Sequence, residues 1–424
     1  ILDNRFKYSH RLIISITGGL YMKQLEQFFL LIDQCLNDTE FIRKHALSEK
    51  DFTRNRILTF RNTFWGLLAH TGASLQSEIP LLTRKFCGEI PPVSPQAFSK
   101  ARNKMNYTSC KELFEFSAKK LIFHKQYKGY FLAAVDASKI LPPDTSEIRN
   151  VLGTCGNQFS ERAGALVSLL YDPLSDHIIN GILSNCNESE RKNLYTLIEQ
   201  THLENTILLL DRGYPGKEVY RFLSQHKLKY VIRMGIGNSN PRYIRESVNA
   251  DQISTDIKNP DITHRIIRFK LNDNSEELLI TNIYDPQFTV EDFKTLYHFR
   301  WPIETKYDEL KNKFQLEKFT GKTLNSVYQD FYNQMTKLNI ISYLRQISSL
   351  EINSVGHKKK ISIQASIKVF LFYLPKLLHD TFRRIEIIHE ICMLLKKILF
   401  PVRDGRSFSR KKKHTDRKYR YNLK

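Results

Sequence analysis

Two apolar runs that each end in an aspartate constrain the fold of this chain more than any other feature. The first, GYFLAAVDAS, is predicted to be a strand that ends in Asp136, and the second, NTILLLDRGYPG, a strand that ends in Asp211 before a glycine turn. A carboxylate at such a strand end costs desolvation energy unless a partner compensates for it. Either aspartate alone is equally well explained as a turn or helix N-cap residue. Two of them on neighbouring strands favour a site for a hard divalent cation.

The segments around these runs predict a mixed sheet. Strands are expected at ALVSLLYD, HIINGILS and KYVIRM, and helices at NESERKNLYTLIEQT and KEVYRFLSQ. This β-β-β-α-β-α-β order is typical of a sheet flanked by helices. A polar, loop-rich region is expected over 235–261, followed by two alternating strands at HRIIRFKL and ELLITNIY.

Helical spacing prevails on both sides of this region. One short helix is expected to begin at Ser94-Pro95, with serine as the N-cap and proline in the first turn. One of its faces would carry Ala97, Phe98 and Ala101, and the other would carry Gln96, Lys100, Asn103 and Lys104. The polar face is either the DNA-reading side of a helix-turn-helix-like domain or an ordinary solvated surface.

The net charge and the cysteine pattern limit the kinds of function that the chain can have. The chain has 65 Lys+Arg against 44 Asp+Glu, a net charge of +21, which suits nucleic acid or, less often, an anionic membrane surface. Six scattered cysteines without a C-x-x-C pair argue against a zinc module and a disulfide framework, and fit a reducing cytosol. No apolar run approaches the length of a membrane span, so no membrane partner is predicted.

The segment YHFRWPIETKYDELK carries a spaced polar signature. Tyr297, Arg300, Glu304 and Lys311 follow the pattern Y-x2-R-x3-E-x6-K. On one continuous α-helix these four side chains would lie within about 60° of one another. Pro302 is expected to begin a new helix, which interrupts that stripe. An ordinary surface helix with an Arg–Glu i,i+4 pair is the alternative.

This signature, behind the two aspartates, resembles that of the DDE transposases of the insertion-sequence-four (YREK) family, with agreement at every position. AAVDAS and LLLDRGYPG are similar to the family's first and second aspartate segments. SPQAFSKARNKM, EKFTGKTLNSVYQDFYNQM and RSFSRKK resemble further family segments. The resemblance covers nearly the whole chain from Met22.

The resemblance implies an α/β fold with an RNase H-like mixed sheet flanked by helices. The catalytic domain would occupy 126–345 and contain a β-strand insertion at about 235–289. We expect a helical N-terminal DNA-binding domain over 22–125 and a helical C-terminal region over 346–402. The basic tail over 403–424 would be a disordered, phosphate-binding arm. Because the first methionine is Met22, residues 1–21 are expected to be upstream read-through or disordered.

The resemblance also implies the chemistry. Asp136, Asp211 and Glu304 would be catalytic and would hold two Mg²⁺ or Mn²⁺ ions about 4 Å apart. Their carboxylates should then lie within roughly 4–8 Å of each other. One ion would activate water or a DNA 3′-hydroxyl, and the other would stabilise the leaving oxygen. The implied function is cleavage and strand transfer at the ends of the chain's own insertion sequence, in cut-and-paste transposition.

The implied partners are double-stranded DNA, as terminal inverted repeats and target, and a second copy in a homodimeric synaptic complex. The implied location is the bacterial cytoplasm, in association with the nucleoid. A decayed or domesticated transposase that only binds DNA is one alternative. Another RNase H-like nuclease is the second.

Further residues are assigned to DNA contacts. Tyr297, Arg300 and Lys311 would contact phosphates near the cleaved end, and Arg212 would either neutralise a phosphate or form a structural salt bridge. The family often stacks a flipped terminal base on a tryptophan of the β insertion. Here the tryptophans are Trp65 and Trp301, and neither lies there. Trp301 is expected to pack in the core, which leaves Tyr284, Phe269 or Phe288 as substitutes.

Overall fold

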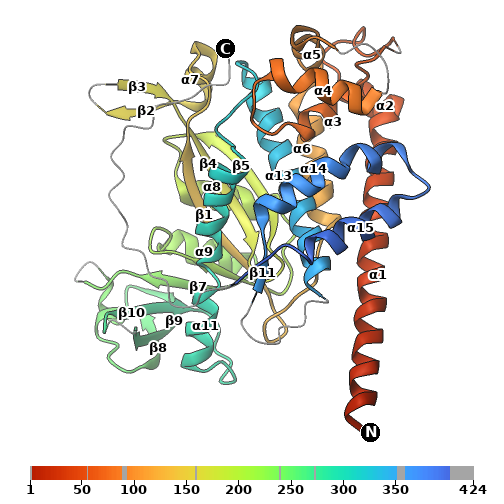
Figure 1. Cartoon of the computed structure of the whole chain (residues 1–424). Coiled ribbons are helices and arrows are strands. Elements are labelled where there is room, and N and C mark those ends of the chain that lie inside the picture. Colours follow the sequence, from red (N-terminus) through yellow and green to blue (C-terminus); the bar gives the residue numbers. More distant parts are fainter. Residues whose placement is uncertain are drawn as a thin grey trace. The chain divides into compact units, whose positions relative to one another are not determined.

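The chain forms two compact units in the computed structural model (Figure 1). The structure describes residues 2–54, 56–87, 93–157, 160–237, 240–271, 274–350 and 359–401. The sheet unit comprises His124–Leu141 and Arg149–Asp308, and the helical unit comprises Ile1–Phe123, Pro142–Ile148 and Glu309–Lys424. The region expected to be catalytic, 126–345, is therefore shared between the units. The basic tail over 403–424 lies outside the described residues.

One eight-stranded sheet organises the sheet unit, in the order β5-β4-β1-β6-β7-β10-β9-β8 (Figure 1). The pairs β1–β6 and β6–β7 are parallel, and the other neighbouring pairs are antiparallel. The mixed sheet predicted from the sequence is thus confirmed. Its strands are β1 (Phe131–Ile140), β4 (Ala165–Asp172), β5 (His177–Asn185), β6 (Thr206–Leu210), β7 (Lys229–Met234), β8 (Asp251–Asp256), β9 (Asn259–Lys270) and β10 (Glu276–Thr281).

Helices cover both faces of this sheet, because side chains alternate along each strand. On one face, Leu170 and Ile266 belong to a buried cluster that includes residues of α8 (Glu190–Glu199) and α9 (Lys217–Gln225). Their strand neighbours point to the other face, where α11 (Val290–His298) and α12 (Pro302–Asp308) pack. There the Arg265 guanidinium lies 5.1 Å from the Phe293 ring centre of α11, and Lys306 Nζ of α12 lies 5.6 Å from the Tyr171 ring centre.

Two strand predictions need correction. β1 does not end at Asp136 but continues to Ile140, because β4 keeps pairing with it as far as Ala165 after the pairing with β6 has stopped. The region 235–261 is not purely loop, since it contains α10 (Arg242–Arg245) and β8. β8 is an edge strand with mostly exposed polar residues, so it carries no hydrophobic signal.

Smaller elements complete the sheet unit. A hairpin of β2 (Thr154–Asn157) and β3 (Ser160–Ala163) precedes β4 and was not predicted. Helix α7 (Ser146–Leu152) runs across the boundary between the two units. The predicted start of a helix at Pro302 is confirmed by α12.

The helical unit is built around α13 (Leu324–Ser349), which packs against α3, α6 and α15. The boundary expected at Met22 falls inside α1, which continues through Thr17, Gly18 and Gly19 without a break. None of the described helices is long and apolar enough to cross a lipid bilayer. The other elements are α1 (Leu2–Asn37), α2 (Thr39–His45), α3 (Phe60–Ala69), α4 (Leu75–Cys87), α5 (Pro95–Arg102), α6 (Tyr107–Lys120), the π-helix η1 (Glu309–Lys313), α14 (Ile363–His379), α15 (Arg384–Leu395), β11 (Lys359–Ile361) and β12 (Leu399–Pro401).

Candidate active site

Asp136 and Asp211 occupy matching positions on adjacent parallel strands. Ala134 of β1 pairs with Leu209 of β6, and each aspartate lies two residues further along its own chain direction. Residues two apart on a strand point to the same face. The Asp136 side chain therefore extends from the sheet face on which α12 packs, opposite the cluster with α8 and α9. Asp211 comes directly after the end of β6, where its Oδ1 accepts a hydrogen bond from the Gly213 backbone N–H at 2.8 Å. The expectation that the two aspartates lie on neighbouring strands is confirmed.

The Asp136 carboxyl lies in a charged and half-buried environment. Burial is the main cause that raises its pKa, to about 6. The charges of Asp211 and Glu190 also raise this pKa, whereas the Ala137 backbone N–H and the Arg300 guanidinium lower it. Such mutual repulsion among carboxylates is what a bound cation would relieve.

Helix α12 is fixed to the sheet directly beside Asp136. The buried Tyr307 hydroxyl lies between β1 and β4. It is 2.7 Å from the Asp136 backbone oxygen and 3.0 Å from the Val167 backbone oxygen, to which it can donate a hydrogen bond. Lys306, which is also buried, forms an ion pair with Asp176 at 2.5 Å. Glu304 lies three residues before Tyr307 on the same helix, so these two contacts set its position against β1 and β4.

Arg300 connects the glutamate to the tyrosine of the signature. Its Nη2 donates to Glu304 Oε1 at 2.5 Å, so the i,i+4 pair expected of an ordinary helix is present. Its guanidinium carbon lies 5.7 Å from the Tyr297 ring centre. Burial acts to lower the pKa of Arg300, but the hydrogen bond to Glu304 and the nearby Tyr297 and Asp136 outweigh burial and raise it. The Tyr297 hydroxyl and Arg300 Nε are buried without a hydrogen-bond partner in the described chain.

The carboxylates of Asp136, Asp211 and Glu304 are the hard oxygen donors that Mg²⁺ and Mn²⁺ bind. Within the described residues, no three His, Cys, Asp or Glu side chains form a ready-made metal cluster. Carboxylates without a cation repel one another, and here Arg300 neutralises Glu304. The donor set fits a divalent cation by its chemistry. That all three carboxylates hold it together stays a prediction.

Trp301 does not pack in the core, so that prediction is wrong. It is 55% exposed and immediately precedes α12, which begins at Pro302. The Arg300 guanidinium carbon lies 5.9 Å from its ring centre. Of the proposed substitutes, Phe288 is buried, and Tyr284 is 43% exposed with its hydroxyl 2.6 Å from the Thr263 backbone oxygen.

Two other predicted DNA contacts are Lys311 and Arg212. The four signature residues do not share one continuous α-helix: α11 ends at His298, α12 begins at Pro302, and Lys311 belongs to η1 in the helical unit. A π-helix turns less per residue than an α-helix, which the sequence pattern did not reveal. Arg212 is exposed and forms no ion pair within the described part of the chain, so its salt-bridge alternative is not observed. Phe269, the remaining aromatic candidate, is half-buried beneath Lys294.

Helix α5 is confirmed but ends at Arg102, so Gln96 and Lys100 lie on it, Asn103 is its C-cap and Lys104 follows it. Ser94 caps it by accepting a hydrogen bond from the Ala97 backbone N–H, and Phe98 and Ala101 are buried. The four polar residues proposed to read DNA are all exposed, and Lys104 forms an ion pair with Asp51 at 3.3 Å. These exposed residues are Gln96, Lys100, Asn103 and Lys104.

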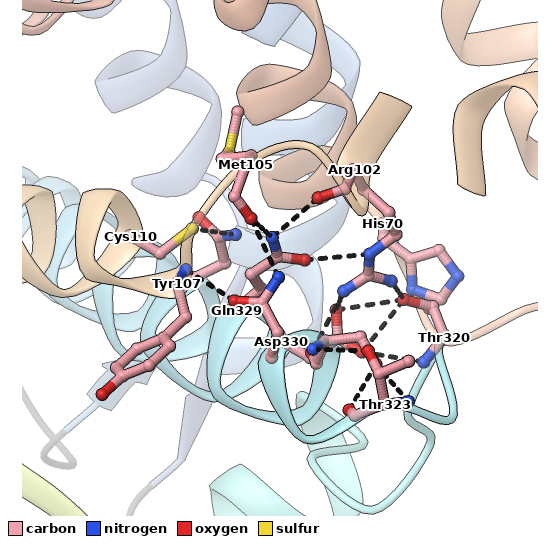
Figure 2. Close-up of polar contacts among 12 residues, drawn as sticks. His70, Arg102, Met105, Tyr107, Cys110, Thr320, Thr323, Gln329 and Asp330 are labelled. Atoms are coloured by element: carbon pink, nitrogen blue, oxygen red, sulfur yellow. Dashed lines mark hydrogen bonds and ion pairs between the residues drawn. The ribbon is translucent and has the colours of Figure 1, made fainter. Parts of the chain in front are cut away.

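The C-terminal end of α5 is held on α13 by a buried polar network (Figure 2). Arg102 donates to Gln329 at 3.0 Å, to Asp330 at 2.9 Å, to the Ser326 backbone oxygen at 3.1 Å and to the Thr320 hydroxyl. Gln329 in turn donates to the backbone oxygens of Arg102 and Met105. The network therefore fixes the orientation of the exposed polar face of α5 within the helical unit.

Sequence reasoning missed three residues near the carboxylates, namely Glu190, Tyr214 and Tyr307. Tyr307 carried a usable signal, because a position three residues after Glu304 lies on the same helical face. Tyr214 stands three residues after Asp211 in the glycine turn. Glu190 carried no usable sequence signal, since an acidic residue in the first turn of a helix is common.

The comparisons with known proteins agree with this geometry. The family model described as a transposase DDE domain matches residues 128–340, half of the chain. The transposase InsG for insertion sequence element IS4 of Escherichia coli (strain K12) is 22% identical over 393 residues, which cover 86% of this chain and 88% of that relative. A cryo-EM structure of the piggyBac transposase synaptic complex with hairpin DNA has a similar fold. Its TM-score is 0.50 at 10% identity, over 89% of this chain and 87% of that one.

Proposed function

The chain belongs to the transposase DDE domain family, and from this premise we propose how it acts on DNA. It is a transposase with the RNase H-like fold, of the type found in insertion sequence element IS4. We propose that it cleaves both ends of its own insertion sequence and joins them to target DNA, with Asp136, Asp211 and Glu304 as its catalytic carboxylates.

The observation that carries this proposal is the register of the sheet. Asp136 and Asp211 each lie two residues beyond a paired position of β1 and β6, and the Tyr307 hydroxyl ties the helix that bears Glu304 to the backbone of Asp136. Asp136 on β1, Asp211 directly after β6 and Glu304 on α12 all belong to the sheet unit, which supports a shared site. Two divalent cations, Mg²⁺ or Mn²⁺, would supply activation of the attacking oxygen and stabilisation of the leaving oxygen.

The chain's own residues would position the DNA end. Tyr297 and Arg300 have buried polar atoms without partners on the same face, and a phosphate oxygen would satisfy them. The exposed Trp301 indole beside Arg300 offers a stacking surface for an unpaired base. Lys311 and Arg212 would add phosphate contacts that give affinity without sequence information.

Recognition of the element ends is assigned to α5. Its exposed Gln96, Lys100, Asn103 and Lys104 present the amide and cationic groups that bind base edges and phosphates. The net charge of +21 supports binding to duplex DNA. A homodimer is proposed because two ends must be cleaved and joined together.

A cleavage assay on a duplex that carries the element's own end tests the proposal. The terminal inverted repeats that flank the coding sequence supply this substrate. Asp136→Asn should abolish Mg²⁺-dependent cleavage but leave gel-shift binding of the same duplex largely intact, because it removes a metal-binding charge and no phosphate contact. Asp261→Asn, which removes an exposed carboxylate from the same sheet, should cleave like the wild type. Equal loss of cleavage and binding in Asp136→Asn would mean that Asp136 is structural.

A further inference from the structure

A fourth carboxylate approaches Asp211 from the first turn of α8. A Cβ placed on Gly213 would lie 3.1 Å from Asp211 Oδ1 and 3.6 Å from Glu190 Oε2. The two carboxylates therefore face the same small space above Gly213. Like charges placed so close cost energy unless a cation lies between them.

The contact between α8 and the loop after Asp211 is built by specific hydrogen bonds. Arg191, the residue after Glu190, donates to the backbone oxygens of Gly213 at 3.2 Å and Pro215 at 2.5 Å. A Cβ on Gly216 would lie 3.0 Å from Arg191 Nη1, so the loop and the guanidinium fit closely. Arg191 thus holds the first turn of α8, which includes Glu190, at a fixed place beside Asp211.

A buried hydroxyl, that of Tyr214, lies within the electrostatic influence of the same carboxylates. Tyr214 is 1% exposed, and its hydroxyl has no hydrogen-bond partner among the described residues. Besides burial, the charges that act most on this hydroxyl are those of Glu190, Asp136 and Asp211, in that order. A buried hydroxyl without a partner costs about 1–3 kcal/mol. A ligand-bound water or a rearranged carboxylate at this place would give the hydroxyl an acceptor.

We propose that Glu190 is a fourth carboxylate of the divalent-cation site, beside Asp211, and that the Tyr214 hydroxyl orders this carboxylate pair by hydrogen bonding. The proposal rests on the proposed function, since it adds a ligand to the same site. In this role, Glu190 adds negative charge on the Asp211 side and so favours the cation that binds there. Tyr214 is a positioning residue.

A simpler role for Glu190 would be to stabilise α8 through its helix dipole. Glu190 lies in the first turn, and the N-cap residue Ser189 makes no side-chain capping bond. An acidic residue there stabilises a helix whether or not a metal is present. The two roles differ in one measurable respect, because only a metal ligand changes the affinity of the protein for a cation.

Mn²⁺ binding to the full-length protein separates these roles. Free Mn²⁺ is measured by electron paramagnetic resonance during a titration into the millimolar range, without DNA. Glu190→Gln should weaken Mn²⁺ binding by about tenfold, the usual size of such effects, and Tyr214→Phe should weaken it by a smaller factor. Glu199→Gln, an exposed glutamate at the other end of α8, is the matched control and should bind Mn²⁺ like the wild type.

Asp211→Asn distinguishes failure of this inference from failure of the proposed function. If Asp211→Asn loses Mn²⁺ while Glu190→Gln keeps wild-type affinity, the site stands and Glu190 is not part of it. If the wild type binds no Mn²⁺, or Asp211→Asn binds it unchanged, the metal site itself is overturned, and Glu190 with it. Because Glu190 is exposed, its variant should fold, which the unchanged far-ultraviolet circular dichroism of Glu190→Gln and Glu199→Gln would verify.

Discussion

Two buried arginines, one in each unit, are treated differently by the fold. Arg102 of the helical unit pairs with Asp330, and all three of its guanidinium nitrogens donate hydrogen bonds (Figure 2). Arg300 of the sheet unit pairs with Glu304, but its Nε has no partner in the described chain. Both side chains are at most 5% exposed. Burial alone therefore does not distinguish them, and the completeness of their hydrogen bonding does.

This difference in hydrogen bonding distinguishes a structural network from a ligand-binding site. Polar groups that hold a fold together are satisfied within the chain, because an unsatisfied buried group costs free energy. Near Asp136 and Asp211, three buried groups lack partners, namely the Tyr214 hydroxyl, the Tyr297 hydroxyl and Arg300 Nε. Their positions around the carboxylates are consistent with groups that meet a ligand. Buried atoms of the helical unit can also lack a partner in the described chain, as Asn333 Oδ1 and Gln334 Oε1 of α13 do. His264 Nε2 is a further case, and it packs among Tyr220, Tyr230 and Tyr243 in the core of the sheet unit.

The largest expected effect is on the satisfied network. Arg102→Met removes one partner of a buried ion pair and leaves Asp330 uncompensated, which should lower the free energy of unfolding by about 3–5 kcal/mol. Urea unfolding monitored by circular dichroism measures it. At a low temperature where the variant is folded, and with saturating DNA so that weaker binding through α5 does not limit the reaction, its cleavage rate should remain close to that of the wild type, because Arg102 contacts none of the three carboxylates. A loss of less than about 1 kcal/mol would remove the contrast between the two arginines.

His264 tests whether an unsatisfied group outside the site behaves as a plain burial cost. Burial lowers the pKa of His264 to about 4, below its value near 6.5 in an unfolded chain. The unfolded state therefore takes up a proton first as pH falls, and stability is lost between about pH 6.5 and pH 4. Between about pH 6.5 and pH 4, the free energy of unfolding should fall in both proteins. The fall should be about 3 kcal/mol larger in the wild type than in His264→Phe. Parallel curves for the two proteins would show that His264 is not buried in its neutral form.

Arg300→Met should have a small effect on stability and a large effect on cleavage, the reverse of Arg102→Met. Because the Glu304 side chain is 27% exposed, water can replace its lost partner, and the stability loss should be only about 1–2 kcal/mol. The cleavage rate should fall by about a hundredfold, since a charged donor near the reacting phosphate is lost. Unfolding and cleavage measured on one preparation decide it. A variant that unfolds readily yet cleaves at the wild-type rate would place Arg300 with the structural arginines.

The smallest expected effect concerns Lys311, which lies in the helical unit. As a phosphate contact it should contribute about one unit to the slope of log K against log salt concentration on duplex DNA. Lys311→Ala should therefore weaken binding to specific and random duplexes by similar factors and flatten that slope by about one unit. Titrations at several salt concentrations measure this. An unchanged slope and cleavage rate would leave Lys311 outside the site.

The sequence located the chemistry better than it located the packing. Asp211 and Pro302 could be placed because an apolar run ends at the first and the fixed φ of proline begins a helix at the second. β1 was predicted too short, because Ala137, Ser138 and Lys139 lack a strand's apolar pattern and are held only by pairing with β4. That pairing is a long-range contact and leaves no trace in local composition.

The contacts that shape the site were beyond the sequence for the same reason. Tyr307 contacts a backbone oxygen 171 positions away in the sequence, and Arg191 contacts the Gly213 backbone oxygen 22 positions away. The exposed position of Trp301 depends on where α12 turns, whereas its apolar character alone favoured the core. Which residues carry charge can be read from a sequence, but which of them remain unsatisfied when buried requires coordinates.

The central claim is that Asp136, Asp211 and Glu304 hold divalent cations together. Anomalous scattering from Mn²⁺ in crystals of the full-length protein tests it most directly, because it locates the metal independently of any activity. We predict anomalous peaks bound by carboxylate oxygens of all three residues at about 2.1 Å. Peaks elsewhere in the molecule, with Glu304 still paired to Arg300 and the two aspartates free of metal, would contradict the account.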